Sequence, residues 1–188
     1  MLNCTMKTVL IASLVFATSG VHAADSESEP GFWSTPAIPG FGKMHELPKS
    51  AYRPEARKTY KIVFALTKGV KGAGDVNPSL DRVARTVNLY VASGVPESQL
   101  KFVAIVYGEA TPLVLDDAHY REKFDEPNPN LPLIALLRKA GVDVAVCGQA
   151  VAEHHFDYGW VDRSVTTALS GLTTVTTLEQ SGYALMPL

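Results

Sequence analysis

Cysteine is scarce in this chain. Cys4 and Cys147 are the only two among 188 residues, and Cys4 lies in a segment, residues 1–23, that resembles a secretory signal peptide. Lys7 precedes the short apolar run 8–17, and small residues stand before the expected cleavage site after residue 23. Cleavage leaves a single thiol, which excludes an intrachain disulfide. A lone cysteine in an oxidising compartment is expected to be buried, bonded to another chain or used chemically.

Long hydrophobic runs are also missing. The apolar run of the leader is too short to cross a bilayer, and no later stretch reaches the roughly 20 apolar residues that a membrane helix needs. We therefore expect an exported protein, periplasmic or secreted, with no membrane span. The remaining residues, 24–188, have the length of one ordinary domain.

A strong charge of either sign is absent. Lys and Arg number 17 against 19 Asp and Glu, and the loss of Lys7 with the leader changes this to 16 against 19, a formal net charge of −3. No basic cluster accompanies this mild acidic excess, which argues against nucleic acid or an anionic membrane as a partner. With 46% apolar residues, the composition also argues against disorder.

Several common catalytic motifs are missing as well. The glycine-rich loop 67–77 matches neither G-x-x-x-x-G-K-[ST] nor G-x-G-x-x-G, so it does not indicate a nucleotide site. Ser170 lacks the G-x-S-x-G context of a hydrolase nucleophile. Because C-x-x-C is absent too, any sulfur chemistry needs one cysteine and a partner. We predict no cofactor.

What the sequence does have is a regular alternation of apolar segments, which predicts strands and helices in turn. The expected strands span 60–67, 100–108, 142–148, 164–171 and 183–188, and the expected helices span 77–94, 128–141 and 172–182. Strands that alternate with helices imply parallel pairing. Residues 59–188 are therefore predicted to form a three-layer α/β/α domain with a mainly parallel sheet of about five strands.

An extended, proline-rich N-terminal arm is predicted before this domain, over residues 24–58. Its five prolines disfavour helix in the residues that precede them. We expect the arm to lie across the domain or across a neighbouring subunit, because it carries too many large apolar side chains for a solvated tail. These side chains are Phe32, Trp33, Ile38, Phe41 and Leu47.

Cys147 is predicted to lie at the carboxyl end of the third strand. The carboxyl ends of parallel strands form the sheet edge at which ligands and chemistry gather. The same edge should hold residues 67–74, residues 107–111 and Ser170. In the alternative interpretation Cys147 is a packed core residue, since free cysteine is among the most buried residue types.

Two histidines, His154 and His155, follow Cys147 at a separation of seven and eight residues. Cysteine with two histidines is a zinc-capable set, but adjacent histidines point apart and the spacing matches no standard closed site. One of them could instead stabilise a thiolate as an acid–base neighbour, or both could be exposed loop residues. We assign no metal ligands, and a Cys/His metal-binding protein stays open as an alternative.

Four stretches of the chain are similar to a known family. They are NLYVASGV (88–95), YREKF (120–124), NPNLPLIALLRKAGVDVAVCGQA (128–150) and ALSGLTTVTTLEQSGYALMPL (168–188). Over about residues 60–188 the chain resembles the DsrE/DsrF-like (YchN-like) family, in particular its exported single-domain branch. The resemblance implies a parallel α/β sheet and homo-oligomers, commonly trimers or hexamers. It also implies a cysteine after the third strand that carries sulfur as a persulfide between partner proteins, and Cys147 stands at that position.

The chain departs from the family at one point of the expected site. Tyr107-Gly108 stands where relatives often have His-Gly. The acid–base role of that histidine is therefore not carried over, although a tyrosine can still donate a hydrogen bond.

These observations lead us to predict a sulfur carrier or sulfurtransferase-like protein, in which a Cys147 thiolate accepts sulfane sulfur from a donor protein and passes it to an acceptor. Backbone N–H groups at Gly148 and Gln149 would open a helical turn that favours the charged sulfur, and Gly148 would leave room for a second sulfur. The rival prediction is a non-catalytic oligomeric module that binds a small ligand or serves assembly. The residues expected around the sulfur are Gly148, Gln149, Tyr107, Gly108, Glu109, His154 and His155.

Overall fold

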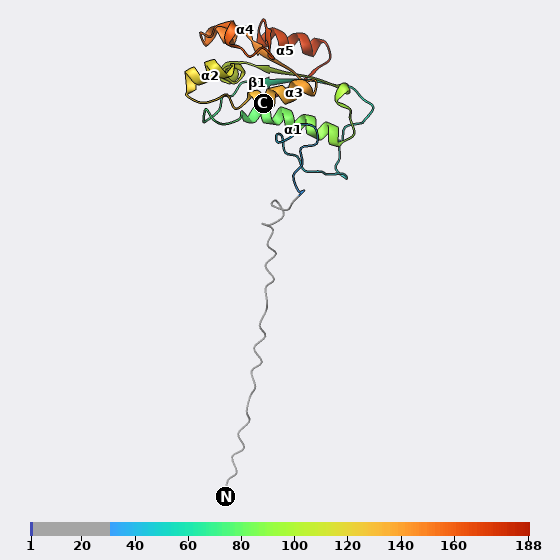
Figure 1. Cartoon of the computed structure of the whole chain (residues 1–188). Coiled ribbons are helices and arrows are strands. Elements are labelled where there is room, and N and C mark those ends of the chain that lie inside the picture. Colours follow the sequence, from blue (N-terminus) through green and yellow to red (C-terminus); the bar gives the residue numbers. More distant parts are fainter. Residues whose placement is uncertain (2–30) are drawn as a thin grey trace. The chain divides into compact units, whose positions relative to one another are not determined.

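A parallel β-sheet forms the centre of the domain in the computed structural model, which describes Met1 and residues 31–188. The sheet has five strands in the order β4-β3-β2-β1-β5, and every neighbouring pair is parallel (Figure 1). The predicted α/β/α class is therefore confirmed. The predicted signal peptide and residues 24–30 of the predicted arm lie outside the described residues.

The five strands follow the apolar runs of the sequence. They are β1 (Tyr60–Leu66), β2 (Leu100–Val106), β3 (Asp143–Cys147), β4 (Thr166–Ala168) and β5 (Ala184–Pro187). β4 is shorter than predicted because a turn precedes it, in which the Asp162 carboxylate accepts from the backbone N–H of Ser164. After β4 the chain leaves the sheet, since the Ser170 side chain caps the next helix.

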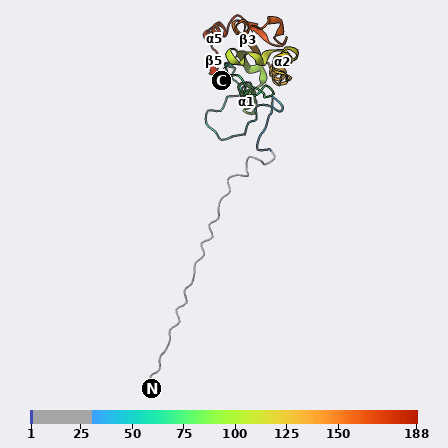
Figure 2. The same ribbon diagram turned by 90° about the vertical axis from the view of Figure 1, so that its left-hand side faces the viewer.

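Helices cover the two faces of this sheet unequally. α1 (Pro78–Ala92) and α3 (Leu131–Lys139) pack on one face, and α5 (Gly171–Gln180) packs on the other. In both views α1 lies on the side of the sheet away from α5 (Figure 1, Figure 2). Most of the core lies on the α1 and α3 side, where the fully buried side chains include Phe64, Val87 and Leu137. Each such side chain contributes roughly 1.5–3 kcal/mol relative to its exposed state.

Local capping explains where α1 begins and ends. The Asn77 side chain accepts from the backbone N–H groups of Ser79 and Leu80, and Pro78 occupies the first turn, where its missing N–H is not needed. The helix stops before Gly94, whose φ of +89° favours glycine. The predicted helix over 77–94 is therefore confirmed.

The sequence patterns did not predict every helix. α2 (Asp117–Phe124) was not predicted, and of the short α4 (Gly148–Glu153) only the opening turn was expected; three 3₁₀ segments are also present, η2 (Glu97–Gln99), η3 (Gly108–Val114) and η4 (Tyr158–Trp160). α2 escapes the apolar pattern because it buries only Tyr120. Its caps were the available signal, since Asp116 precedes it and basic residues occupy its last turn.

Residues 33–58 contain no helix and lie against α1. An isolated antiparallel bridge joins Ser34 to Met44, and Ile38 is fully buried in the main core. The side chain of Asn88 on α1 accepts from the backbone N–H groups of Ala37 and Ile38 at 2.9 Å each. Within the described part of the chain, no helix is both long and apolar enough to cross a bilayer.

Candidate functional site

The carboxyl ends of the strands bring the predicted site segments to one edge of the sheet. β1 and β2 pair in register up to Leu66 and Val106, and β3 and β4 pair up to Cys147 and Ala168. The loops that follow these four residues therefore share one edge, which is where parallel sheets place their ligand sites.

Cys147 is the last residue of β3 and the N-cap of α4. Its Sγ atom accepts a hydrogen bond from the backbone N–H of Ala150 at 3.3 Å, so the sulfur is held by the first turn of the helix. The residue is buried, with 6% of its surface exposed. The helical turn predicted to open at Gly148 and Gln149 is present as the start of α4, and the N–H group that contacts the sulfur is that of Ala150.

Gly148 and Gln149 connect α4 to the segment after β4. A Cβ at Gly148 would lie 2.9 Å from the Ala168 carbonyl oxygen, so only glycine fits there without a shift of the backbone. The room for a second sulfur that was expected from the missing side chain of Gly148 is therefore not open on this side, because the Ala168 carbonyl oxygen occupies it. Gln149 is exposed, and its Nε2 donates to the Leu169 carbonyl at 3.2 Å.

Tyr107, Gly108 and Glu109 follow β2 at the same edge. The half-buried Tyr107 ring lies against Gly171, where a Cβ would come within 3.0 Å of two ring carbons. Gly108 has a φ of +59° and starts η3, a conformation that glycine adopts without cost. Glu109 is exposed in the first turn of η3, and its backbone lies beside Gly69.

The two adjacent histidines, His154 and His155, lie at the end of α4. His154 Nε2 lies 2.9 Å from the Gly108 carbonyl oxygen, and its ring stacks on Phe156 with centroids 5.2 Å apart. His155 has a φ of 56° at the end of α4. In residues 31–188 no three side chains of His, Cys, Asp or Glu are grouped so as to hold a metal ion.

The roles of two residues near Cys147 were missed by the sequence interpretation. The Tyr158 hydroxyl donates to the Gly148 carbonyl at 3.1 Å, which ties η4 to α4. Ser170 was expected at this edge, but its role as a helix cap was missed: its side chain accepts from the backbone N–H of Leu172 and begins α5. The available signal was the position of Ser170 directly before a helical pattern.

A cavity of about 340 Å³ lies at the same edge, after β1 and β2. The loop 69–73, Glu109 and Tyr120 are among its walls. The Tyr120 hydroxyl donates to the Ala73 carbonyl at 2.8 Å and so fixes the loop. Burial, and to a smaller extent the charge of Glu126, raises the pKa of Tyr120, which keeps this phenol a neutral donor.

Comparison with known proteins identifies the family but not an activity. No curated protein matches the chain. Among solved structures, the chain is similar to the "Protein of Unknown Function MTH1491 from Methanobacterium thermoautotrophicum", at 15% identity and a TM-score of 0.48, over 69% of this chain and 99% of the other. Residues 60–188 match the DsrE/DsrF-like family. That range holds every strand of the sheet and the whole edge described above, and the chain belongs to the DsrE/DsrF-like family.

Proposed function

We propose that this protein is an exported sulfur-relay protein, periplasmic or secreted, in which Cys147 carries sulfane sulfur between a donor and an acceptor protein. One observation carries the proposal: in a chain of the DsrE/DsrF-like family, the cysteine lies where β3 ends, with its sulfur on the first turn of α4. The carboxyl edge of a parallel sheet is the general location of reactive groups in this architecture.

The proposed reaction is a thiol–persulfide exchange. The Cys147 thiolate attacks the outer sulfur of a donor persulfide, R–S–SH, and the donor S–S bond breaks. The new S–S bond leaves Cys147–S–S⁻, and the released donor sulfur takes the proton as R–SH. The exchange has no net oxidation or reduction, so it needs neither metal nor cofactor. Transfer to the acceptor is the same exchange in the opposite sense.

The donor persulfide has to reach the Cys147 sulfur for this reaction, but the residue is only 6% exposed. α4 is a six-residue helix, and exposed side chains connect it to the neighbouring segments. The Gln149 side chain donates a hydrogen bond to the Leu169 carbonyl, and the Tyr158 hydroxyl donates one to the Gly148 carbonyl. We infer that a docking donor protein displaces these two side chains and so opens a path to the sulfur.

Intact-mass spectrometry tests the proposal. After incubation of the native protein with glutathione persulfide, we expect a mass gain of one sulfur that maps to Cys147 and disappears on treatment with a reducing thiol. In the mature chain, from which residues 1–23 have been cleaved, Cys147→Ser should gain none. A native protein whose Cys147 neither gains sulfur nor reacts with iodoacetamide, but reacts with both after denaturation, would contradict the proposal.

That negative result would support a second candidate, a non-catalytic oligomeric binding or assembly module. The burial of Cys147 is the observation that favours it, since packed cysteines behave as small hydrophobic residues. We propose homo-oligomers under either function, because Leu169 and Leu172, beside α5, are 73% and 76% exposed.

A further inference from the structure

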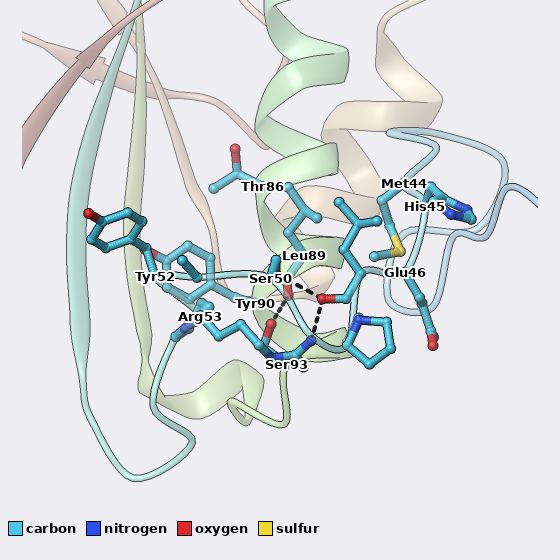
Figure 3. A pocket seen from close by; sticks show the side chains of 15 residues that line it. Met44, His45, Glu46, Ser50, Tyr52, Arg53, Thr86, Leu89, Tyr90 and Ser93 are labelled. Atoms are coloured by element: carbon cyan, nitrogen blue, oxygen red, sulfur yellow. Dashed lines mark hydrogen bonds between the residues drawn. The ribbon is translucent and has the colours of Figure 1, made fainter.

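A second cavity of about 340 Å³ lies between α1 and the arm segment 44–54. One wall is a face of α1 that carries Thr86, Leu89, Tyr90 and Ser93, three or four residues apart along the helix. Figure 3 shows these side chains opposite those of the arm, with open space between them. The cavity is separate from the Cys147 edge, and the proposed function does not use it.

The walls of this cavity are held in place from both ends of the arm segment. On one side Asn88 is fully buried, and its Nδ2 donates to the carbonyls of Phe41 and Gly42. The Gly42 N–H also donates to the Asp81 carboxylate at 2.7 Å. On the other side the Tyr60 hydroxyl accepts from the Glu55 N–H at 2.6 Å. These contacts fix the two ends of the arm segment that borders the cavity.

Apolar side chains on both walls stay uncovered. Leu89 on α1 is 42% exposed, and Leu47 on the arm is 60% exposed. Tyr90 adds an aromatic wall that is fixed by an edge contact with Tyr60, with ring centroids 4.6 Å apart. Burial, followed by the nearby Tyr60, raises the pKa of Tyr90, so this wall is uncharged. Such a space favours the apolar part of a ligand.

Positive charge lies at the rim. Arg53 Nη1 donates to the Leu47 carbonyl at 2.9 Å, and the Ser50 hydroxyl donates to the same oxygen at 2.8 Å, which closes the loop of the arm. Among the described residues Arg53 forms no ion pair with a carboxylate. Residues 43–58 hold five Lys and Arg against two Glu. In Figure 3 the Arg53 guanidinium lies beside Ser93, whereas the Glu46 carboxylate points away from the cavity.

We propose that this cavity binds a small amphipathic carboxylate, with its apolar chain against Leu47, Leu89 and Tyr90 and its carboxylate on Arg53. A guanidinium has five N–H donors, and its fork geometry matches a carboxylate. The donor to Leu47 can keep its bond while the remaining N–H groups bind the ligand. A neutral ligand of the same length would gain only the apolar contact.

Isothermal titration calorimetry with octanoate and 1-octanol tests this proposal on the full chain. We expect octanoate to bind at least about tenfold more tightly than octanol, as one charge-assisted contact allows. Arg53→Gln keeps a donor for the Leu47 carbonyl but removes the charge, so it should weaken octanoate about tenfold and leave octanol unchanged. Leu89→Glu should abolish octanoate binding, because it places a carboxylate in the apolar wall.

Arg57→Gln is the matched control, since Arg57 is an exposed cation of the same arm that does not line the cavity. It should change octanoate affinity less than about twofold, and circular dichroism should show all three variants folded. The proposal is wrong if the unmodified chain does not bind octanoate, if octanol binds equally well, or if Arg57→Gln weakens binding as much as Arg53→Gln does.

Discussion

Asn88 is the residue that joins the arm to the domain. It is fully buried on α1, and its amide makes four hydrogen bonds with arm backbone, at Ala37, Ile38, Phe41 and Gly42. A buried amide of this kind is costly to truncate, because its partners lose hydrogen bonds that water replaces only if the arm moves away.

We therefore expect Asn88→Ala to lower the free energy of unfolding by about 2 kcal/mol or more. Urea denaturation measures the loss, and limited proteolysis should cut the arm of the variant first. Thr86→Ala, two residues away on α1 and only partly buried, serves as the control and should change stability by about 0.5 kcal/mol or less. Equal stability of the two variants would mean that the arm contributes nothing to the fold.

At the scale of elements, α2 shows how a helix forms without an apolar stripe. The Asp116 side chain accepts from the backbone N–H of His119 at 2.9 Å and also pairs with the His119 ring, which stacks on Trp160. Desolvation raises the pKa of Asp116, but the His119 backbone N–H and ring outweigh it, so the pKa lies below its usual 3.8. The ionised carboxylate therefore stabilises the start of the helix.

Replacement of Asp116 should act through this cap. Asp116→Ala should cost about 1 kcal/mol near neutral pH, and Asp116→Asn less, because asparagine also caps helices. Since the pKa of the folded state is lowered, the stabilisation is complete above the usual value and is lost as the pH falls through the lowered one. Urea midpoints should thus show wild type and Asp116→Asn converging in acid. A constant difference at every pH would show that the charge has no role.

The predicted elements are largely those observed, because their signals are local. Asn77 and Pro78 begin α1, and alternating apolar runs form the buried central strands. α2 and the shortened β4 differed, because their limits depend on Asp116 and Asp162, whose side chains cap nearby backbone. Such hydrogen bonds leave no mark in an apolar pattern.

At the scale of the whole molecule, the main feature is that helices cover the two faces of the sheet unequally. In the described part of the chain the small core cluster on one face is covered by α5, and the exposed leucines Leu169, Leu172 and Leu185 lie in α5 or near it. Exposed apolar side chains of this size, gathered near one helix, are typical of a surface that a partner covers. The Leu169 carbonyl also accepts from Gln149, so this surface adjoins the Cys147 segment.

If the surface joins copies of this chain, Leu172→Asp should lower the mass measured by light scattering after size-exclusion chromatography. The introduced carboxylate would have to lose water in the interface without a partner, which is unfavourable. Thr176→Asp, also exposed on α5, is the control for added charge on the same helix. A wild-type chain that elutes as a monomer at high concentration would contradict the proposal.

The sequence by itself determined the alternation of strands and helices, the parallel sheet and the position of Cys147 at the end of β3, since each follows from apolar periodicity and capping within a few residues. Only the tertiary structure decided how far the sulfur is buried, that the Ala168 carbonyl borders Gly148, and that the arm leaves a cavity over α1. Each of these features depends on contacts between residues that are distant in the chain. They depend on how side chains fill space between elements, which no local pattern records.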